Sequence, residues 1–348
     1  MACRSTGAAV SVHARAPLRV DFAGGWTDVP EYAAREGGVV VAAGITRYAH
    51  VDAYLGGKKI KLAAEDLDDR VTYQVASQIR YDGRLDLHKA ALNLLPVTGG
   101  IELLSRSDAP GGSGLGASGA LDVALVAVLA YCRHEPYDES SLAELGFMLE
   151  AQELGLLGGR QDQLTAALGG FQRYEFGDDL VKARRLSVSA AAAEDLRRHV
   201  VLAYTGHSHF SSETHGHVWD GFREGDSRVV EALAEIRGLG EDAAEQVERG
   251  DWEALAATVD SNWRAQQRLH PTIATAHTST IENAVRTSGA WGVKATGAGA
   301  GGCMLVLCPT MVRSDVEEAV QRAGGHILEL EFEMEGVNVW ERSDDATR

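Results

Sequence analysis

Residues 108–121, DAPGGSGLGASGAL, decide the fold, because a proline and a run of small residues lead directly into a long apolar segment. Glycines lack a Cβ atom, so backbone N–H groups in this stretch can close around an anion. A helix that begins near Ser118 points its positive dipole end at the same place. The helix sequence ALDVALVAVLAYC is apolar on almost every face, which predicts a buried element that anchors the loop. The stretch therefore predicts binding of a nucleotide or a sugar phosphate.

Two common phosphate loops fit this stretch poorly. A Walker-type loop places Lys and then Ser or Thr after its last glycine, whereas Ala117 and Ser118 follow Gly116. Gly114, Gly116 and Gly119 do form a G-x-G-x-x-G match, but the polar segment SRSDAP precedes them where a dinucleotide fold needs a strand. A second match, in KATGAGAGGCMLVL, leads into a strand-like segment instead of a helix. These contexts argue against both a P-loop and a Rossmann fold.

Composition places the chain among soluble globular proteins with two domains or one large domain. Of its 348 residues, 45% are hydrophobic and 24% are charged. No apolar run approaches the ~20 residues of a membrane span, and the N-terminus lacks the hydrophobic core of a secretory signal. The four cysteines show no C-x-x-C spacing, as expected for reduced thiols. We therefore expect a cytoplasmic protein without disulfides and without a membrane partner.

Net charge limits the partners further. A formal charge of −17 would repel nucleic acid, and no basic patch interleaved with aromatic residues reverses that field locally. We therefore expect no nucleic-acid partner. The sequence does not fix the oligomeric state, and a homodimer stays open.

Strand and helix signals are segregated along the chain. The first third is rich in strand signals of antiparallel type, at residues 39–45, 48–55, 58–64 and 71–76. A helical pattern then runs from 119 to about 170, and a strand at 200–206 begins a second cycle. Later elements are helices near 228–247, 251–268 and 273–288, the strand CMLVLC, another helix and a closing strand near FEMEGVNVW. This order predicts an α+β fold, with a boundary within 180–199 that gives domains 1–190 and 191–348.

Three ordered segments resemble the motifs of the GHMP kinase superfamily, which comprises galacto-, homoserine, mevalonate and phosphomevalonate kinases. They are RAPLRVDFAGGWTDVPEYAAREGGVVVAAGITRYAHV from Arg15, PGGSGLGASGA from Pro110 and KATGAGAGGCMLVL from Lys294. The resemblance spans nearly the whole chain. It implies a ribosomal-protein-like N-terminal domain and a ferredoxin-like C-terminal domain, with the active site of an ATP- and Mg²⁺-dependent kinase between them.

Within this superfamily, the segments FAGGWTD, GGRQDQ and LTAALGGF are similar to heptose-7-phosphate kinases and fucokinases, which phosphorylate the anomeric hydroxyl of a sugar. The resemblance implies D-glycero-D-manno-heptose 7-phosphate as the leading acceptor and the 1,7-bisphosphate as product. Galactokinases place Glu and His just before their sugar-binding aspartate, where Gly25 and Trp26 stand here. The alternatives are a cyclitol phosphate kinase, a fucokinase-like sugar 1-kinase and a non-catalytic sensor of ATP and sugar. Intact Asp162, Ser118 and Glu150 argue against the sensor.

The resemblance also assigns residues to the transfer reaction. Asp162, in GGRQDQ, becomes the base or the orienting carboxylate for the acceptor hydroxyl, although an aspartate beside glycines is commonly only a helix N-cap. Arg19 stands where sugar kinases of the superfamily keep an arginine near the reacting centre, and a bidentate arginine suits transition-state charge. The residues expected to bind ATP are Pro110, Gly111, Gly112, Ser113, Gly114, Leu115, Gly116, Ala117 and Ser118.

Ser118 and Glu150 are the expected Mg²⁺ ligands. Family members commonly carry two or three consecutive serines in the loop, whereas Ser118 alone remains at this place. Helix capping by Ser118 is an alternative that is compatible with metal binding. Glu150 matches the family's metal-binding glutamate by its distance from Asp162, with Glu153 as a competitor and a solvated helix carboxylate as the other interpretation.

The acceptor site is expected to combine Gly25, Trp26, Thr27, Asp28, Gly159, Arg160, Gly297 and Gly299. Asp28 stands where the family keeps an aspartate on sugar hydroxyls, and Trp26 either stacks on a sugar face or belongs to the core. Arg160, Arg47 and nearby histidines are candidates for a distal substrate phosphate. The segment TGHSHFSSETHGH holds two H-x-H pairs that suit a metal, a substrate phosphate or a plain polar loop, at His207, His209, His215 and His217.

Overall fold

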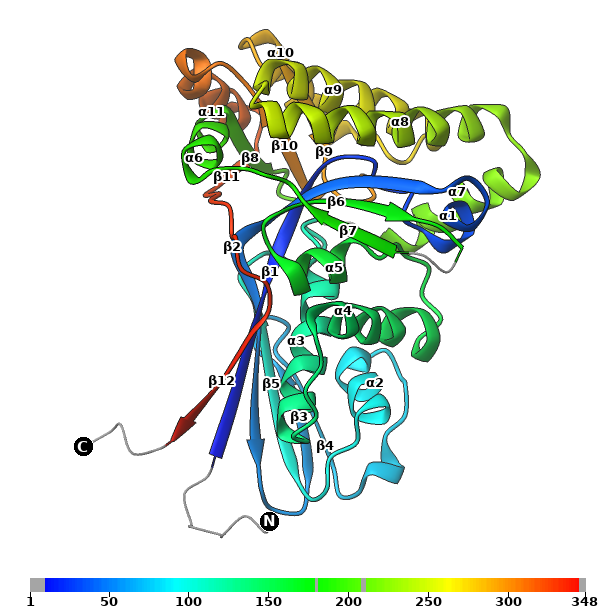
Figure 1. Ribbon diagram of the computed structural model, residues 1–348, viewed down its shortest axis with the longest axis vertical. Coiled ribbons are helices and arrows are strands. Elements are labelled where there is room, and N and C mark those ends of the chain that lie inside the picture. Colours follow the sequence, from blue (N-terminus) through cyan, green and yellow to red (C-terminus); the bar gives the residue numbers. More distant parts are fainter. Residues whose placement is uncertain (1–9, 179–180, 208–210, 344–348) are drawn as a thin grey trace.

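The computed structural model describes residues 10–178, 181–207 and 211–343, which form two sheets with helices packed against them (Figure 1). The strands are β1 (Val10–Ala23), β2 (Gly38–Leu55), β3 (Ile60–Ala64), β4 (Asp69–Tyr73), β5 (Ile101–Ser107), β6 (Phe171–Phe176), β7 (Val181–Arg185), β8 (Val200–Tyr204), β9 (Gly292–Ala295), β10 (Cys303–Leu307), β11 (His326–Leu328) and β12 (Asn338–Ser343). The α-helices are α1 (Pro30–Glu36), α2 (Asp86–Leu94), α3 (Ala117–Cys132), α4 (Glu139–Met148), α5 (Gln161–Leu168), α6 (Ala190–His199), α7 (Ser211–Glu224), α8 (Ser227–Arg249), α9 (Trp252–Leu269), α10 (Ala276–Thr287) and α11 (Arg313–Arg322). Short 3₁₀ turns lie at η1 (Ala76–Gln78) and η3 (Thr310–Val312), and a π-helical turn, η2, at Leu149–Glu153.

The larger sheet is organised around two long strands, β1 and β2. Its strand order is β12-β1-β2-β5-β3-β4, with β6 on β2 and β7 on β6. The segments 39–45 and 48–55, predicted as two strands, form the single strand β2, whose first part pairs with β6 and whose second part pairs with β5. Of the segments predicted as antiparallel strands, β3 and β4 pair antiparallel, whereas β3 runs parallel to β5, a strand that was not predicted. A connection long enough to contain α2 makes that parallel pairing feasible.

Helix α3 is the central buried helix of this first part of the chain. Eleven of its residues are buried, including the run from Asp122 to Ala130, as its apolar sequence predicts. It packs against β1 and β2, and α4 and α5 lie on the same side of the sheet (Figure 1). Burial on all sides holds the N-terminus of α3 in a fixed position, which is the place where the glycine-rich stretch ends.

The smaller sheet has the strand order β11-β8-β10-β9 and is covered on both faces. Alternate residues of β8 point to different cores: Val200 and Leu202 join the large core shared with β1 and β2, whereas Val201 and Ala203 pack with α10 and α11. The long helices α8 and α9 lie antiparallel above the larger sheet (Figure 1). The predicted α+β architecture is confirmed, and the helices expected near 228–247 and 251–268 are α8 and α9.

The last strand returns to the first half of the chain. β12 pairs antiparallel with β1, with Val12 opposite Glu341, and forms the edge of the larger sheet (Figure 1). The predicted domain bounds, 1–190 and 191–348, stay a prediction. The closing strand β12, which lies in the second of these ranges, is part of the larger sheet formed by the first. The described cysteines, Cys132, Cys303 and Cys308, are free thiols. In the described ranges, no helix is both long and apolar enough to cross a membrane.

Candidate active site

The two glycine-rich stretches of the sequence belong to one site. Residues 110–116 lie between β5 and α3, and residues 296–302 connect β9 to β10. The backbone N–H of Cys303 donates to the carbonyl of Ser113 at 2.7 Å, so the two loops are in direct contact. Helix α3 begins at Ala117, and Gly116 precedes it in the left-handed conformation with φ 73°. An added Cβ at Gly116 would lie 3.2 Å from the side chains of Arg19 and Asp162, so a substitution would be crowded there as well as strained by the positive φ.

A cavity of about 360 Å³ opens where these loops meet the first turn of α5. Most of the predicted site residues line it: Arg19, Trp26, Asp28, Gly112, Ser113, Gly114, Gly116, Ala117, Ser118, Glu150, Gly159, Asp162, Gly297 and Gly299. Other lining residues that sequence reasoning did not assign are Val29, Leu156, Leu157, Gly158, Gln161, Ala298 and Gly301, and His215 joins them from α7. The cavity therefore gathers segments from both halves of the chain.

Some predicted residues support the cavity wall without lining it. Leu115 is fully buried in the core, and its carbonyl accepts the backbone N–H of Arg19 at 2.9 Å. The Thr27 hydroxyl donates to the carbonyl of Gly24 at 2.7 Å and so holds the turn that follows β1. These residues shape the backbone instead of contacting a ligand. The other residues predicted for the ATP and acceptor sites that do not line the cavity are Pro110, Gly111, Gly25 and Arg160.

The two arginines considered for a distal phosphate are both engaged elsewhere. Arg160 forms an ion pair with Glu144, and its guanidinium lies 4.2 Å from the centre of the Phe147 ring. Arg47 donates to the carbonyl of Asp108 at 3.0 Å and likewise does not line the cavity. Among the cavity-lining residues that the structure describes, Arg19 is the one lysine or arginine.

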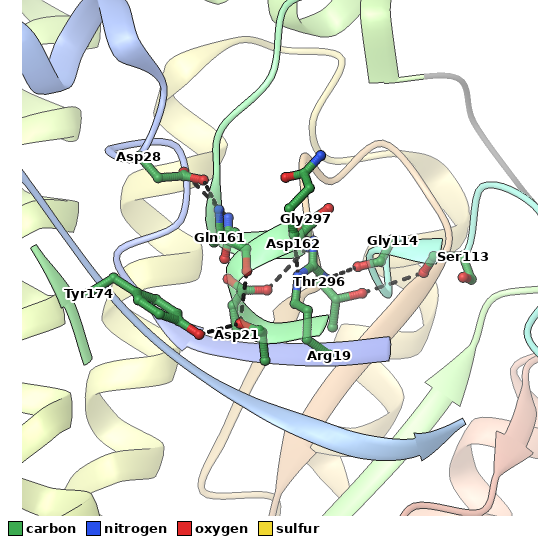
Figure 2. A network of polar contacts seen from close by, with 12 residues as sticks. Arg19, Asp21, Asp28, Ser113, Gly114, Gln161, Asp162, Tyr174, Thr296 and Gly297 are labelled. Atoms are coloured by element: carbon green, nitrogen blue, oxygen red, sulfur yellow. Dashed lines mark hydrogen bonds and ion pairs between the residues drawn. The ribbon is translucent and has the colours of Figure 1, made fainter. Parts of the chain in front are cut away.

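Arg19 and Asp162 form the central charged pair of the cavity. Both Nε and Nη2 of Arg19 lie 2.8 Å from Oδ1 of Asp162, and Nη1 donates to the carbonyl of Gly114 (Figure 2). Burial alone would lower the pKa of Arg19, but the charges of Asp162 and Asp21 hold that pKa above its usual value. Asp162 is not the helix cap considered from the sequence, because Arg160 occupies the N-cap position of α5. Its carboxylate is therefore available to a ligand in the cavity.

Asp28 lies at the N-terminus of α5, on the side of the cavity next to Trp26. Its carboxylate is 2% exposed and accepts the backbone N–H of Gln161 at 3.0 Å and the side-chain amide of Gln161 at 3.4 Å (Figure 2). Burial is the main cause that raises the pKa of Asp28 to about 6, and the nearby charge of Asp162 adds to it. A buried carboxylate held in this way suits recognition of sugar hydroxyls.

Ser118 and Glu150 are neighbours in the cavity lining. Gly116 occupies the N-cap position of α3 and Ser118 is the second residue of the helix, so Ser118 is not the helix cap considered from the sequence. Burial raises the pKa of Glu150, and the neighbouring Ser118 hydroxyl acts against that rise. Glu150 lies on a π-helical turn, an element that occurs frequently at functional sites. Glu153 accepts the Tyr81 hydroxyl at 2.5 Å and does not line the cavity, so Glu150 is the carboxylate in position to hold a metal.

Sequence reasoning missed an acidic neighbour of Glu150. Asp122, one turn beyond Ser118 on α3, is completely buried, and burial and the charge of Glu150 raise its pKa well above the ordinary value. The Gln163 amide donates to Glu150 at 2.9 Å and to Asp122 at 3.4 Å, so it links the two carboxyl groups. The sequence did contain a feature that could have indicated this residue, since Asp122 is the single charged residue in the apolar run ALDVALVAVLAYC.

A second missed group is the buried ion pair of Asp21 and Lys294. Both residues lie inside quoted motifs, in VDFAGG and KATG, but nothing in their spacing indicated that they meet. The pair lies next to the cavity without lining it and joins β1 to β9. It positions the third-motif loop, because Asp21 also accepts the backbone N–H of Gly297 at 3.2 Å.

The histidines of the H-x-H pairs separate in the structure. His215 stacks on Trp26 with ring centres 4.4 Å apart, whereas His217 stacks on His270 at 4.6 Å. His207 contacts His277 through their Nε2 atoms at 2.6 Å, and His209 lies outside the described residues. Across the described part of the chain, no three or more His, Cys, Asp or Glu side chains gather as a metal site. Of these histidines, His215 is the one that lines the cavity in the described ranges.

A glycine-rich loop at a helix N-terminus, with an Arg–Asp pair directly beside it in one cavity, is an arrangement suited to a small-molecule phosphotransferase. The chain matches the family models of the GHMP kinases, with the N-terminal domain at residues 85–170 and the C-terminal domain at residues 243–326. The protein belongs to the GHMP kinases and is an ATP-dependent small-molecule kinase.

Individual relatives agree with this family. The chain is 28% identical, over 95% of its length and 99% of the relative's, to D-glycero-alpha-D-manno-heptose 7-phosphate kinase of Campylobacter jejuni. A solved D-glycero-D-manno-heptose 1-phosphate kinase from Bacteriodes thetaiotaomicron superposes with a TM-score of 0.80 at 24% identity, covering 94% of this chain and 98% of that one. A putative sugar kinase from Campylobacter jejuni gives 0.78 at 27% identity, with 95% and 98% covered.

Proposed function

We propose that the protein transfers the γ-phosphate of ATP to the anomeric hydroxyl of D-glycero-D-manno-heptose 7-phosphate and releases the 1,7-bisphosphate. The observation that carries the proposal is the Arg19–Asp162 pair, held 2.8 Å apart against the N-terminus of α3. The similarity to a heptose 7-phosphate kinase over nearly the whole chain supports the choice of acceptor. Mg²⁺ as the metal and the cytoplasm as the compartment are part of the same proposal.

Each side chain has a role that follows from its position. Backbone N–H groups of the glycine-rich loop and the dipole of α3 bind the phosphates of ATP. Asp162 accepts the proton of the acceptor hydroxyl or orients that hydroxyl, while Arg19 fixes the carboxylate and neutralises charge that develops on the transferred group. Ser118 and Glu150 would hold Mg²⁺, whose chemistry is to neutralise phosphate charge. Asp28 binds acceptor hydroxyls on the other side of the cavity.

One observation favours a second candidate, a fucokinase-like sugar 1-kinase whose acceptor carries no phosphate. The described cavity lining contains no lysine or arginine apart from Arg19, which Asp162 already pairs. Arg160 and Arg47, the residues considered for a distal phosphate, are bound elsewhere. A free sugar needs no such cation, so both acceptor classes belong in the first assay.

The deciding experiment measures phosphate transfer from ATP to a panel of aldoses, aldose phosphates and cyclitol phosphates, with the product position assigned by phosphorus NMR. The proposal expects the highest kcat/KM for the heptose 7-phosphate and a new phosphate at the anomeric carbon. Better use of a free sugar would support the second candidate, and transfer to a non-anomeric hydroxyl would overturn both. Asp162→Asn should lower kcat by about a hundredfold or more while ATP binding persists.

A further inference from the structure

Three polar atoms at the acceptor end of the cavity are buried and have no hydrogen-bond partner. They are Nε1 of Trp26, Nδ1 of His215 and Oε1 of Gln161. All three residues line the cavity next to Asp28. A buried polar atom without a partner destabilises the folded protein by about 1–3 kcal/mol, so nearly all such atoms are paired with protein, ordered water or a bound ligand. Three of them at one wall therefore indicate a ligand with several hydroxyl groups.

His215 and Trp26 form this wall together, although they come from α7 and from the turn after β1. Their rings are stacked with centres 4.4 Å apart and planes 27° apart, and Trp219 packs against the indole at 5.9 Å. Trp26 has a φ of 81°, a left-handed conformation that a bulky residue adopts only when its surroundings hold it. Stacking on His215 is one of the contacts that hold Trp26 there.

The wall is uncharged. Burial lowers the pKa of His215 to about 4, so its imidazole is neutral at physiological pH. A neutral imidazole offers one donor and one acceptor, which suits a hydroxyl group, whereas a phosphate would favour a cation. The indole N–H is a donor and the Gln161 Oε1 is an acceptor, so the wall carries both kinds of hydrogen-bonding atom.

We propose that His215 is a specificity-determining residue of the acceptor site: its Nδ1 exchanges a hydrogen bond with a hydroxyl of the acceptor, and its ring holds the Trp26 indole against the sugar. The acceptor is thus recognised on this wall through a neutral polyol segment, and any distal phosphate lies away from it. The inference rests on the proposed function in that it takes the acceptor to be a sugar or a sugar phosphate.

Two variants of His215 test the proposal with the acceptor that the panel assay identifies. His215→Leu replaces the imidazole with a bulky side chain that has no polar atom. This variant should raise the acceptor KM at least tenfold, with the KM for ATP unchanged. His215→Asn places an amide near the position of Nδ1 and should recover most of that loss. His217→Asn is the matched control, because His217 lies on the same helix, contacts His270 and does not line the cavity. It should behave like the wild type.

Deoxy analogues of the acceptor separate hydrogen bonding from a structural role. The wild type should lose at least tenfold in kcat/KM on one deoxy analogue, and His215→Leu should lose nothing further on that same analogue. Thermal unfolding of each variant shows whether the fold persists. An unchanged acceptor KM in His215→Leu, or equal losses on every deoxy analogue in both proteins, would overturn the proposal.

Binding measurements test the role of His215 separately from the proposed heptose 7-phosphate kinase activity. Calorimetry of the same sugars in the presence of a non-hydrolysable ATP analogue reports acceptor affinity without a transfer reaction. If the wild type does not phosphorylate the heptose 7-phosphate but another sugar binds and loses affinity in His215→Leu, the proposed function fails and the inference about His215 stands. A wild-type protein that binds no sugar of the panel would overturn both.

Discussion

Asp21 and Lys294 form an ion pair in which each side chain is 1% exposed, although 273 positions of the sequence separate them. Lys294 also donates to the main-chain carbonyl of Asp21 at 3.2 Å, and Gly297 donates its N–H to Oδ1 of Asp21. Burial lowers the pKa of Lys294, while the charges of Lys294 and Arg19 outweigh burial and hold the pKa of Asp21 below its usual value. The pair connects β1, which carries Arg19, to the loop that contacts the glycine-rich stretch before α3.

Removing one partner of this pair should destabilise the protein strongly. Lys294→Met leaves the Asp21 carboxylate buried and unpaired, so we expect the free energy of unfolding to fall by about 3–5 kcal/mol. The double variant Asp21→Asn, Lys294→Met carries no buried charge and should regain a large part of that loss. Urea unfolding followed by circular dichroism measures both. Equal destabilisation of the single and the double variant would contradict an electrostatic origin.

Gly119 keeps Asp162 in place. A Cβ added at Gly119 would lie 2.6 Å from Cβ of Asp162, which is closer than real Cβ contacts. Gly119→Ala should therefore displace Asp162 and lower kcat by about ten- to a hundredfold, with a small effect on the KM for ATP. Gly238→Ala, in the interior of α8 where an added Cβ meets open space, is the matched control. Normal kcat in Gly119→Ala would show that α5 moves aside freely.

Ser118→Ala should raise the Mg²⁺ concentration needed for half-maximal rate by about tenfold or more, the scale found when groups around a metal are removed. The physical reason is that Ser118 is a neighbour of Glu150 and does not occupy the N-cap position of α3, so its loss should affect the proposed metal site more than the helix. Ser118→Thr retains the hydroxyl and serves as the control. Rates are measured over a Mg²⁺ titration, with melting temperatures alongside. A lowered melting temperature with an unchanged Mg²⁺ titration would assign Ser118 a structural role.

Asp28 should make stability depend on pH in a direction set by its raised pKa. With a pKa of about 6 in the folded protein against 3.8 in the unfolded chain, the ionised form is disfavoured by folding. The stability that protonated Asp28 contributes to the folded protein is then fully present below pH 3.8 and is lost as pH rises through 6. The free energy of unfolding of Asp28→Asn, relative to that of the wild type, should therefore rise by up to about 3 kcal/mol between pH 4 and pH 7.5.

The same variant should bind the acceptor more weakly, because the carboxylate that pairs with sugar hydroxyls is gone. Thermal unfolding of Asp28→Asn and wild type at several pH values, with acceptor KM at pH 7.5, measures both effects. Melting curves of the two proteins that shift in parallel across the pH range would contradict the raised pKa.

Local sequence was sufficient wherever a property depends on neighbouring residues. The all-round apolar character of ALDVALVAVLAYC predicts the buried helix α3, and the glycines before it predict the turn into its N-terminus. Two strands were expected where β2 is continuous, because residues 46 and 47 are polar. Pairing with β1 on both sides of them, at Ile45 and at Tyr48, keeps the two parts in one strand across a local irregularity. The parallel pairing of β3 with β5 is likewise a property of the sheet and not of either strand.

The sequence by itself determined the family, the glycine-rich stretch before α3 and most of the residues that line the cavity, because these are recorded in ordered motifs of the chain. Tertiary structure decided which side chains meet: Lys294 with Asp21, His215 with Trp26, and Arg160 with Glu144 instead of the acceptor. The reason is physical, since contacts between distant segments follow from packing of sheets and helices, and the direction of a side chain depends on the element that carries it. The motifs show which functional groups the chain carries, and the fold determines which of these groups are in contact.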